Sequence, residues 1–136
     1  MTRRVLDVGQ CNPDHSTITQ FLTANFDVEV VQAHLFDDAM EQLRSGRFDL
    51  VLVNRLLDQD HSEGSEVIKA MQADAGLKTT PVMLVSNFAD AQTAAVTLGA
   101  VPGFGKASLV GGQHDAAGVL EKLTAVLGQT TTDDVL

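Results

Sequence analysis

The sequence has one cysteine, few basic residues and no long apolar run, and each shortage excludes a class of protein. The single cysteine, Cys11, excludes an internal disulfide and favours a reducing compartment. Nine Lys and Arg residues stand against 18 Asp and Glu residues, for a net charge of −9. This balance disfavours nucleic acid and anionic membrane surfaces as partners. No apolar stretch approaches the length of a membrane span.

The amino-terminal stretch begins with basic residues, but Asp7 interrupts its apolar part. A secretory signal needs a continuous apolar segment, so we expect neither a signal peptide nor a lipoprotein signal before Cys11. The expected location is the cytoplasm.

A chain of 136 residues with 44% hydrophobic content suits one domain with a single sizeable core. No linker, repeat or shift in composition divides it. We predict one domain over residues 1–128 and a flexible tail over residues 129–136, which contain three threonines and two aspartates.

The stretch from Phe48 to Asn54 is the centre of the predicted fold. Its four consecutive apolar residues, Leu50–Val53, are typical of a strand buried on both faces of a parallel sheet. In open α/β sheets, ligands and chemistry collect at the carboxyl ends of the strands. Asn54 ends this strand, so we expect its side chain to face the functional crevice.

Four further apolar runs have strand character, and segments with helical spacing separate them. The predicted strands are Val5–Val8, Val28–Val31, Val82–Val85 and Val101–Phe104. Asn12 is the expected N-cap of the first helix, with Pro13 in the first helical position. The expected apolar helix faces are Ile18, Phe21, Leu22 and Phe26; Leu35, Ala39, Met40 and Leu43; Val67, Ile68 and Met71; the alanine-rich Ala89–Leu98; and Val119, Leu120, Leu123, Val126 and Leu127.

The remaining helix bounds follow from stop signals. The second helix is expected from Leu35 to Arg44, the fourth to stop at Gly99, and the fifth to run from about His114 to Leu127. Five alternations of strand and helix with short connections require parallel strands with helices on both faces. The predicted class is a doubly wound α/β fold with five parallel strands and five helices.

The order and spacing of these units resemble the receiver domain of two-component response regulators. The resemblance covers Arg3 to about Leu127. It is carried by Phe48–Val53, by Pro81–Ser86, and by Gly99, Ala100 and Lys106 around the fifth unit. It implies a CheY-like fold with strand order 2-1-3-4-5.

The resemblance also implies a set of site positions, and several have lost their usual residue. The phosphoacceptor aspartate falls on Asn54, and the acidic pair that holds Mg²⁺ falls on Gly9 and Gln10, or on Gln10 and Cys11 in the alternative register. The hydroxyl and lysine positions are retained as Ser86 and Lys106. The aromatic switch position falls on Gly103, and Ala107 replaces the usual proline.

The chemistry at Asn54 decides the functional expectation. An acyl phosphate forms on a carboxylate nucleophile, whereas a carboxamide is neutral and cannot give that product. Mg²⁺ requires hard anionic oxygens, and Gly9 and Gln10 supply no charge. We therefore expect no conventional phosphorylation, no catalytic residue, no cofactor and no metal ion.

Two groups of residues near the same edge offer alternatives. Asp7, Asp14, Asp58 and Asp60 could form a displaced acidic site. A simpler explanation is that Asp7 belongs to a strand, Asp14 starts a helix, and Asp58 and Asp60 lie in a solvated loop. Cys11, His15 and His61 could approach one another, but their spacing matches no metal motif. We interpret both groups as structural.

Asn54, Ser86, Asn87 and Lys106 could form a neutral-to-cationic pocket that binds a small anion or metabolite. Lys106 has lost its usual carboxylate partner, and the replacements we consider are Asp58 or Asp60, a backbone carbonyl, and a small anion. A structural hydrogen-bonded network is the favoured interpretation of these four residues.

The sequence thus predicts an atypical response regulator, or pseudo-receiver, that acts in signal transduction through a protein partner without phosphorylation. By analogy with receivers, the partner or a second copy would bind the face of the fourth helix, fifth strand and fifth helix, where Ala94, Ala95, Val96 and Leu98 lie. The alternatives are a sensor of a small anion and a receiver that uses a displaced aspartate.

Overall fold

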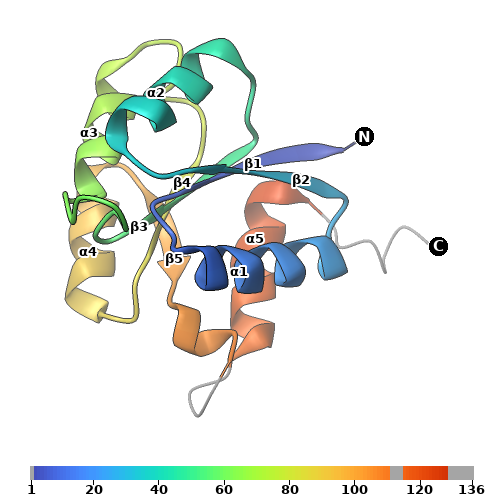
Figure 1. Cartoon of the computed structure of the whole chain (residues 1–136). Helices are drawn as coiled ribbons and strands as arrows, with labels where there is room; N and C mark the ends of the chain where they lie inside the picture. Colours follow the sequence, from blue (N-terminus) through green and yellow to red (C-terminus); the bar gives the residue numbers. More distant parts are fainter. Residues whose placement is uncertain (1, 111–114, 129–136) are drawn as a thin grey trace.

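The computed structural model describes residues 2–110 and 115–128, and strands alternate with helices throughout them (Figure 1). The elements are β1 (Arg3–Val8), α1 (Asn12–Asn25), β2 (Val28–Ala33), α2 (Phe36–Ser45), β3 (Leu50–Asn54), α3 (Ser65–Ala73), β4 (Val82–Val85), α4 (Ala89–Leu98), β5 (Val101–Phe104), the short 3₁₀ helix η1 (Lys106–Ser108) and α5 (Ala116–Leu127).

All pairings in the sheet are parallel, and the strand order is β2-β1-β3-β4-β5. The predicted fold class and strand order are therefore confirmed. Because the first half of the chain winds to one side of β1 and the second half to the other, the carboxyl ends of β1 and β3 meet at the point where the order reverses. This is where doubly wound folds place their sites.

The sheet is covered on both faces, so β3 is apolar over residues 50–53 and β4 over its whole length. Residues 50–53 of β3 are fully buried, and alternate side chains enter opposite cores. One core packs the sheet against α2, α3 and α4. The other packs it against α1 and α5. Figure 1 shows α1 and α5 together on one side of the sheet.

β3 and β4 match the strands predicted for them. β4 has the predicted bounds, and β3 runs from Leu50, the first of its four predicted apolar residues, to Asn54. Phe48 and Asp49 precede β3. The Asp49 carboxylate accepts the Arg4 backbone N–H at 2.8 Å, and the Phe48 ring lies 4.5 Å under the Arg4 guanidinium. Both residues join the amino end of β1 before the strand begins.

Two predicted helix starts were wrong by one residue. Asn12 is the first residue of α1 and Cys11 precedes it as the N-cap, because the Asn12 Oδ1 atom accepts a hydrogen bond from Gln32 at 3.2 Å instead of capping the helix. Leu35 precedes α2, where the Asp38 carboxylate accepts the N–H groups of His34 and Leu35.

The ends of the chain were only partly tested. α5 starts at Ala116 and is capped by Asp115, whose Oδ1 accepts the Gly118 N–H at 3.1 Å. The predicted start at His114 and the predicted tail lie outside the described residues. Within residues 2–110 and 115–128, no helix has the length and apolar content to cross a membrane.

Candidate functional site: the carboxyl edge of the sheet

Asn54 stands at the carboxyl end of β3, in a half-buried position beside the end of β1. Its Nδ2 atom donates to the Gly9 carbonyl oxygen at 3.1 Å, and its Oδ1 atom accepts the Arg55 N–H at 3.1 Å. Both polar atoms of the amide therefore have a partner. A carboxylate could not make the first bond, because it has no proton to donate.

Gly9 lies directly after β1 in the left-handed region, with φ 79°. A Cβ atom there would stand 2.4 Å from the Leu57 Cδ2 atom and 3.0 Å from the Leu57 Cα atom. Leu57 itself is fully buried, and the Gly9 carbonyl also accepts the Asp58 N–H at 3.0 Å. This position is shaped for glycine and has no room for a metal-binding side chain.

Lys106 reaches across the site to α1. Its Nζ atom lies 2.7 Å from Asp14 Oδ2 and 3.3 Å from Gln10 Oε1. Of the partners considered for Lys106, Asp58 and Asp60 were therefore wrong, because the ion pair is made with Asp14 in the first turn of α1. The hydrogen bond from Lys106 holds the pKa of Asp14 below its ordinary value of 3.8.

The four residues of the predicted anion pocket line one small hollow of about 220 Å³. Two of them serve the local backbone: Ser86 Oγ accepts the Phe88 N–H at 3.1 Å, and Asn87 Oδ1 accepts the Ala107 N–H at 3.0 Å. Phe88, 60% exposed, and Arg55 form the outer rim, with the guanidinium 5.3 Å from the ring centroid. The structure thus assembles the four residues, with most of their polar groups already bonded.

Asp7 points away from the hollow and into the layer between β1 and α1, where it is fully buried. His15 Nδ1 lies 2.7 Å from the Asp7 Oδ2 atom, at hydrogen-bond distance. Burial raises the pKa of Asp7 above its ordinary 3.8, and the hydrogen bond from His15 opposes this only in part. Gln10 also favours the carboxylate, although Asp7 Oδ1 and Gln10 Nε2 have no partner at hydrogen-bond geometry within the described residues.

The remaining candidates are dispersed. Asp58 Oδ2 lies 3.2 Å from His34 Nδ1, Asp60 accepts the Ser62 hydroxyl at 2.6 Å, and Cys11 is exposed. His61 is exposed in the loop with φ 59°. In the part of the chain that the structure describes, no three His, Cys, Asp or Glu side chains are placed to hold a metal ion.

Gln92 of α4 is a site residue that sequence reasoning missed. Its Nε2 atom donates to the carbonyl oxygens of Leu84 at 2.8 Å and Ser86 at 3.1 Å, with a longer contact to Phe104 at 3.5 Å. Its Oε1 atom accepts the Gly103 N–H at 3.1 Å. One side chain thus ties α4 to both β4 and β5. The only sequence signal is a polar residue on an alanine-rich helix.

Gly103 admits no side chain in this arrangement. A Cβ atom there would stand 2.2 Å from the Leu84 carbonyl oxygen and 3.1 Å from Gln92 Oε1. The Lys122 ammonium donates to the Gly103 carbonyl at 3.0 Å. Position 103 is therefore closed by backbone and by Gln92.

Solved structures of response regulators share this architecture. A Chloroflexus aurantiacus J-10-fl chain described as a response regulator matches with TM-score 0.76 and 17% identity over 95% of this chain and all of its own. The chemotaxis response regulator CheY4 of Vibrio cholerae matches with TM-score 0.71 and 19% identity, over 93% of this chain and 100% of CheY4. The phosphorylated cyanobacterial phytochrome response regulator RcpA matches with TM-score 0.68 and 21% identity, over 93% of this chain and 91% of RcpA.

No protein-family model matches the sequence, and no curated protein is significantly similar to it. The likeness therefore lies in the path of the backbone, at identities where side chains at the site need not be shared. The chain has the CheY-like α/β fold of response regulator receiver domains.

Proposed function

We propose that this protein is a pseudo-receiver: a receiver-like domain that acts in signal transduction by protein–protein interaction and without phosphorylation. The observation that carries the proposal is the Asn54 amide, which donates to the Gly9 carbonyl where receivers have a phosphoacceptor carboxylate. RcpA, with the same fold, was solved in a phosphorylated form. The Asn54 amide offers no nucleophile for that reaction.

The metal position supports the same proposal. Phosphoryl transfer to an aspartate needs a divalent cation that neutralises the developing charge. Gly9 contributes no side chain, and Gln10 turns its Oε1 toward Lys106. The space that a carboxylate at position 9 would need is filled by Leu57. The sequence thus supplies no metal-binding carboxylate at position 9, and the packing of Leu57 leaves no space for one.

A fixed α4 is the second part of the proposal. The hydrogen bonds of Gln92 to β4 and β5 hold α4 in one position, and Gly103 has no side chain to rotate. A switch requires two arrangements of similar free energy. The Gln92 contacts favour one of them, so we infer a constitutive surface that a partner recognises or biases.

The surface of α4, β5 and α5 is the proposed contact face. Val96 is 43% exposed, and a hollow of about 360 Å³ beside it is lined by Pro102, Gly103 and Lys122 among others. Small residues and an exposed valine are compatible with an apolar anchor from a partner. A protein partner is the first choice and a homodimer the second.

The alternatives have less support in the contacts. Lys106 would be the cation of an anion sensor, but its charge is already paired with Asp14 at 2.7 Å. Asp14 would be a displaced phosphoacceptor, but among the described residues no three His, Cys, Asp or Glu side chains are placed to hold a metal ion.

The test is the intact mass of the protein after incubation with acetyl phosphate, with and without Mg²⁺. We expect no added phosphate, while an active receiver treated in parallel gains one. A Mg²⁺-dependent phosphate adduct would overturn the proposal, and fragment mapping would show whether Asp14 had taken the place of Asn54.

The homodimer is tested by sedimentation velocity over a range of concentrations. If α4 forms the interface, Val96→Glu abolishes a concentration-dependent increase in mass, whereas Val110→Glu, which also replaces an exposed valine, leaves it unchanged. A monomer at all concentrations leaves the face to a different protein.

A further inference from the structure

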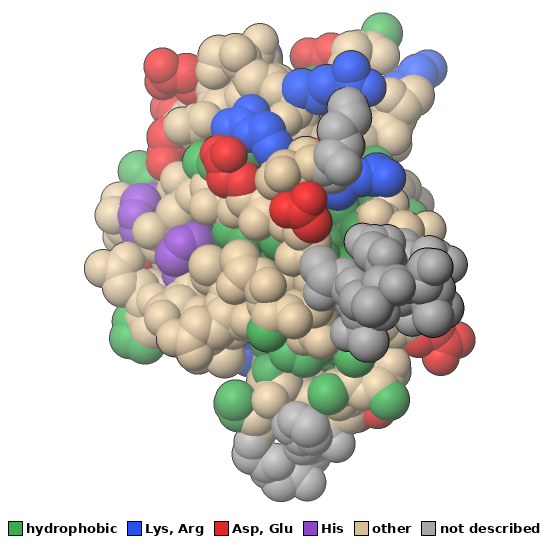
Figure 2. Space-filling model, turned by 90° about the vertical axis from the view of Figure 1, so that its right-hand side faces the viewer, with side chains coloured by type: hydrophobic (Ala, Val, Ile, Leu, Met, Phe, Trp, Pro, Cys, Tyr) green, Lys and Arg blue, Asp and Glu red, His purple; other side chains and the backbone are tan. Residues whose placement is uncertain are grey.

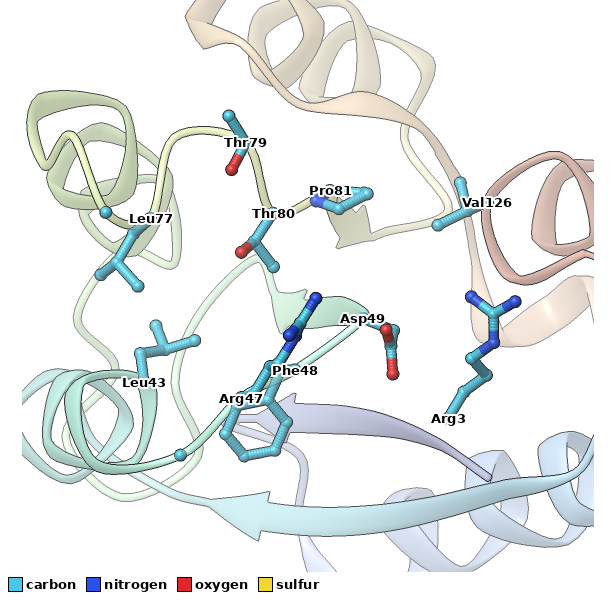
Figure 3. Close-up of a pocket in the computed structure, with 12 residues that line it drawn as sticks. Arg3, Leu43, Arg47, Phe48, Asp49, Leu77, Thr79, Thr80, Pro81 and Val126 are labelled. Carbon is cyan, nitrogen blue, oxygen red and sulfur yellow. The ribbon is translucent and has the colours of Figure 1, made fainter. Parts of the chain in front are cut away.

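A second hollow lies at the opposite edge of the sheet, at the amino ends of β1, β3 and β4 (Figure 3). It has a volume of about 520 Å³, larger than the hollow beside Asn54. It is far from the receiver-like site, and nothing in the proposed function uses it. Its lining combines arginines, threonines and one aspartate with an apolar wall.

The charge of the lining is unusual for this chain. The protein carries 18 acidic and only 9 basic residues, yet Arg3 and Arg47 both line this hollow. Within residues 2–110 and 115–128, neither guanidinium has an ion-pair or hydrogen-bond partner, although the Arg47 carbonyl accepts from Arg4 at 3.2 Å. Figure 2 shows Lys and Arg side chains on the upper half of one face, with Asp and Glu side chains among them.

The neighbouring Arg4 provides the contrast. Its guanidinium lies 3.6 Å from Glu29, donates to the Arg47 carbonyl and stacks on Phe48. Arg4 therefore has a structural role that accounts for its charge. The unpartnered groups of Arg3 and Arg47 have no such role in the described fold.

The polar groups around them are those that hold an anionic ligand. Figure 3 shows Arg47 directed toward the segment that contains Thr80, with Asp49 between Arg47 and Arg3 in this view. Asp49 Oδ2 accepts a hydrogen bond from the Arg4 backbone N–H at 2.8 Å, which leaves Oδ1 to accept a hydrogen bond from a ligand hydroxyl or amine. Leu43, Leu77 and Pro81 add an apolar wall.

We propose that this hollow binds a small organic anion. Arg47 and the Thr80 hydroxyl hold its phosphate or carboxylate group, and Arg3 adds a second positive charge. Asp49 accepts a hydrogen bond from a hydroxyl or amine of the same ligand. The apolar part of the ligand packs on Leu43, Leu77 and Pro81. Guanidinium groups suit both phosphate and carboxylate because they donate two parallel hydrogen bonds.

The experiment is a titration of the full ¹⁵N-labelled chain, followed by amide chemical shifts, with four probes: AMP, citrate, inorganic phosphate and uncharged adenosine. AMP and citrate distinguish a phosphate ester from a carboxylate as the preferred group. We expect one of them to shift the amides of residues 47–49 and 77–80 more strongly than inorganic phosphate, and adenosine to shift them least.

Arg47→Gln is expected to weaken that binding by about tenfold, the size of one charge-assisted contact. Lys69→Gln removes one positive charge from an exposed position on α3, outside this hollow, and is expected to leave the affinity unchanged. Both residues are exposed, so both variants should fold. The proposal is overturned if no probe shifts these amides below roughly 10 mM, a value weaker than most specific sites, or if the two variants bind equally. Either failure leaves the phosphorylation test unaffected.

Discussion

The ammonium group of Lys106 lies 2.7 Å from the carboxylate of Asp14, and this ion pair joins residues 92 positions apart in the chain. It connects the start of η1 to the first turn of α1 across the carboxyl edge of the sheet. The charge of Lys106 is thus used in a contact with a helix at this edge.

Asp14→Asn tests the strength of this contact. The side chains of the pair are 27% and 40% exposed, so the loss of unfolding free energy is expected to be about 0.5 to 1 kcal/mol at pH 7. Because the folded pKa of Asp14 is lowered, its contribution is present above pH 3.8 and disappears as the pH falls through the folded value. Urea denaturation of both proteins from pH 3 to pH 7 measures this; an equal difference at every pH would contradict it.

Asp7→Asn is expected to have the opposite pH dependence. The pKa of Asp7 is raised in the folded protein, so its ionisation costs stability as the pH rises above 3.8. Asparagine keeps an acceptor for His15 Nδ1 but cannot ionise. Relative to the parent, the variant should gain stability with rising pH, on the order of 1 kcal/mol, as expected for a buried charge with one unpaired oxygen.

The groups that face Asp7 are His15, Gln10 and, at longer range, Lys106. His15→Gln is the matched control, because it removes the pairing partner and retains the carboxylate. It should lower stability most at high pH. A stability of Asp7→Asn relative to the parent that falls as the pH rises would contradict the raised pKa of Asp7.

Gln92→Leu removes the side chain that ties α4 to β4 and β5. The backbone acceptors at Leu84 and Ser86 lose a donor, and the Gly103 N–H loses its acceptor, so we expect a loss of about 1 to 3 kcal/mol. Hydrogen exchange of the Gly103 amide should accelerate. Thr93→Ala, at an exposed neighbouring position, should have little effect on either measurement.

Asn54→Asp by itself is expected not to restore phosphorylation. The new carboxylate would face the Gly9 carbonyl without a proton to donate, and no acidic pair would hold Mg²⁺ beside it. We expect unchanged intact mass with acetyl phosphate and Mg²⁺, together with a stability loss of about 1 kcal/mol. A phosphate adduct on the introduced carboxylate would show that the substitution at position 54 alone had silenced the site.

The sequence by itself was sufficient for the fold. Continuous apolar runs such as Leu50–Val53 require burial on both faces, and the helical periods between them require crossovers, so chain order determined the sheet. The loss of a nucleophile at Asn54 was equally visible, because a carboxamide cannot act as a carboxylate in any environment.

Only the tertiary structure decided which side chains meet. The partner of Lys106, the burial of Asp7 against His15 and the contacts of Gln92 depend on the directions of side chains from separate elements. The positive φ of Gly9 and the position of Leu57 likewise cannot be inferred from the amino-acid composition or from the hydrophobic periodicity of the sequence. Local patterns specify elements, whereas a site depends on ångström-scale distances between residues that the fold brings together from far apart in the chain.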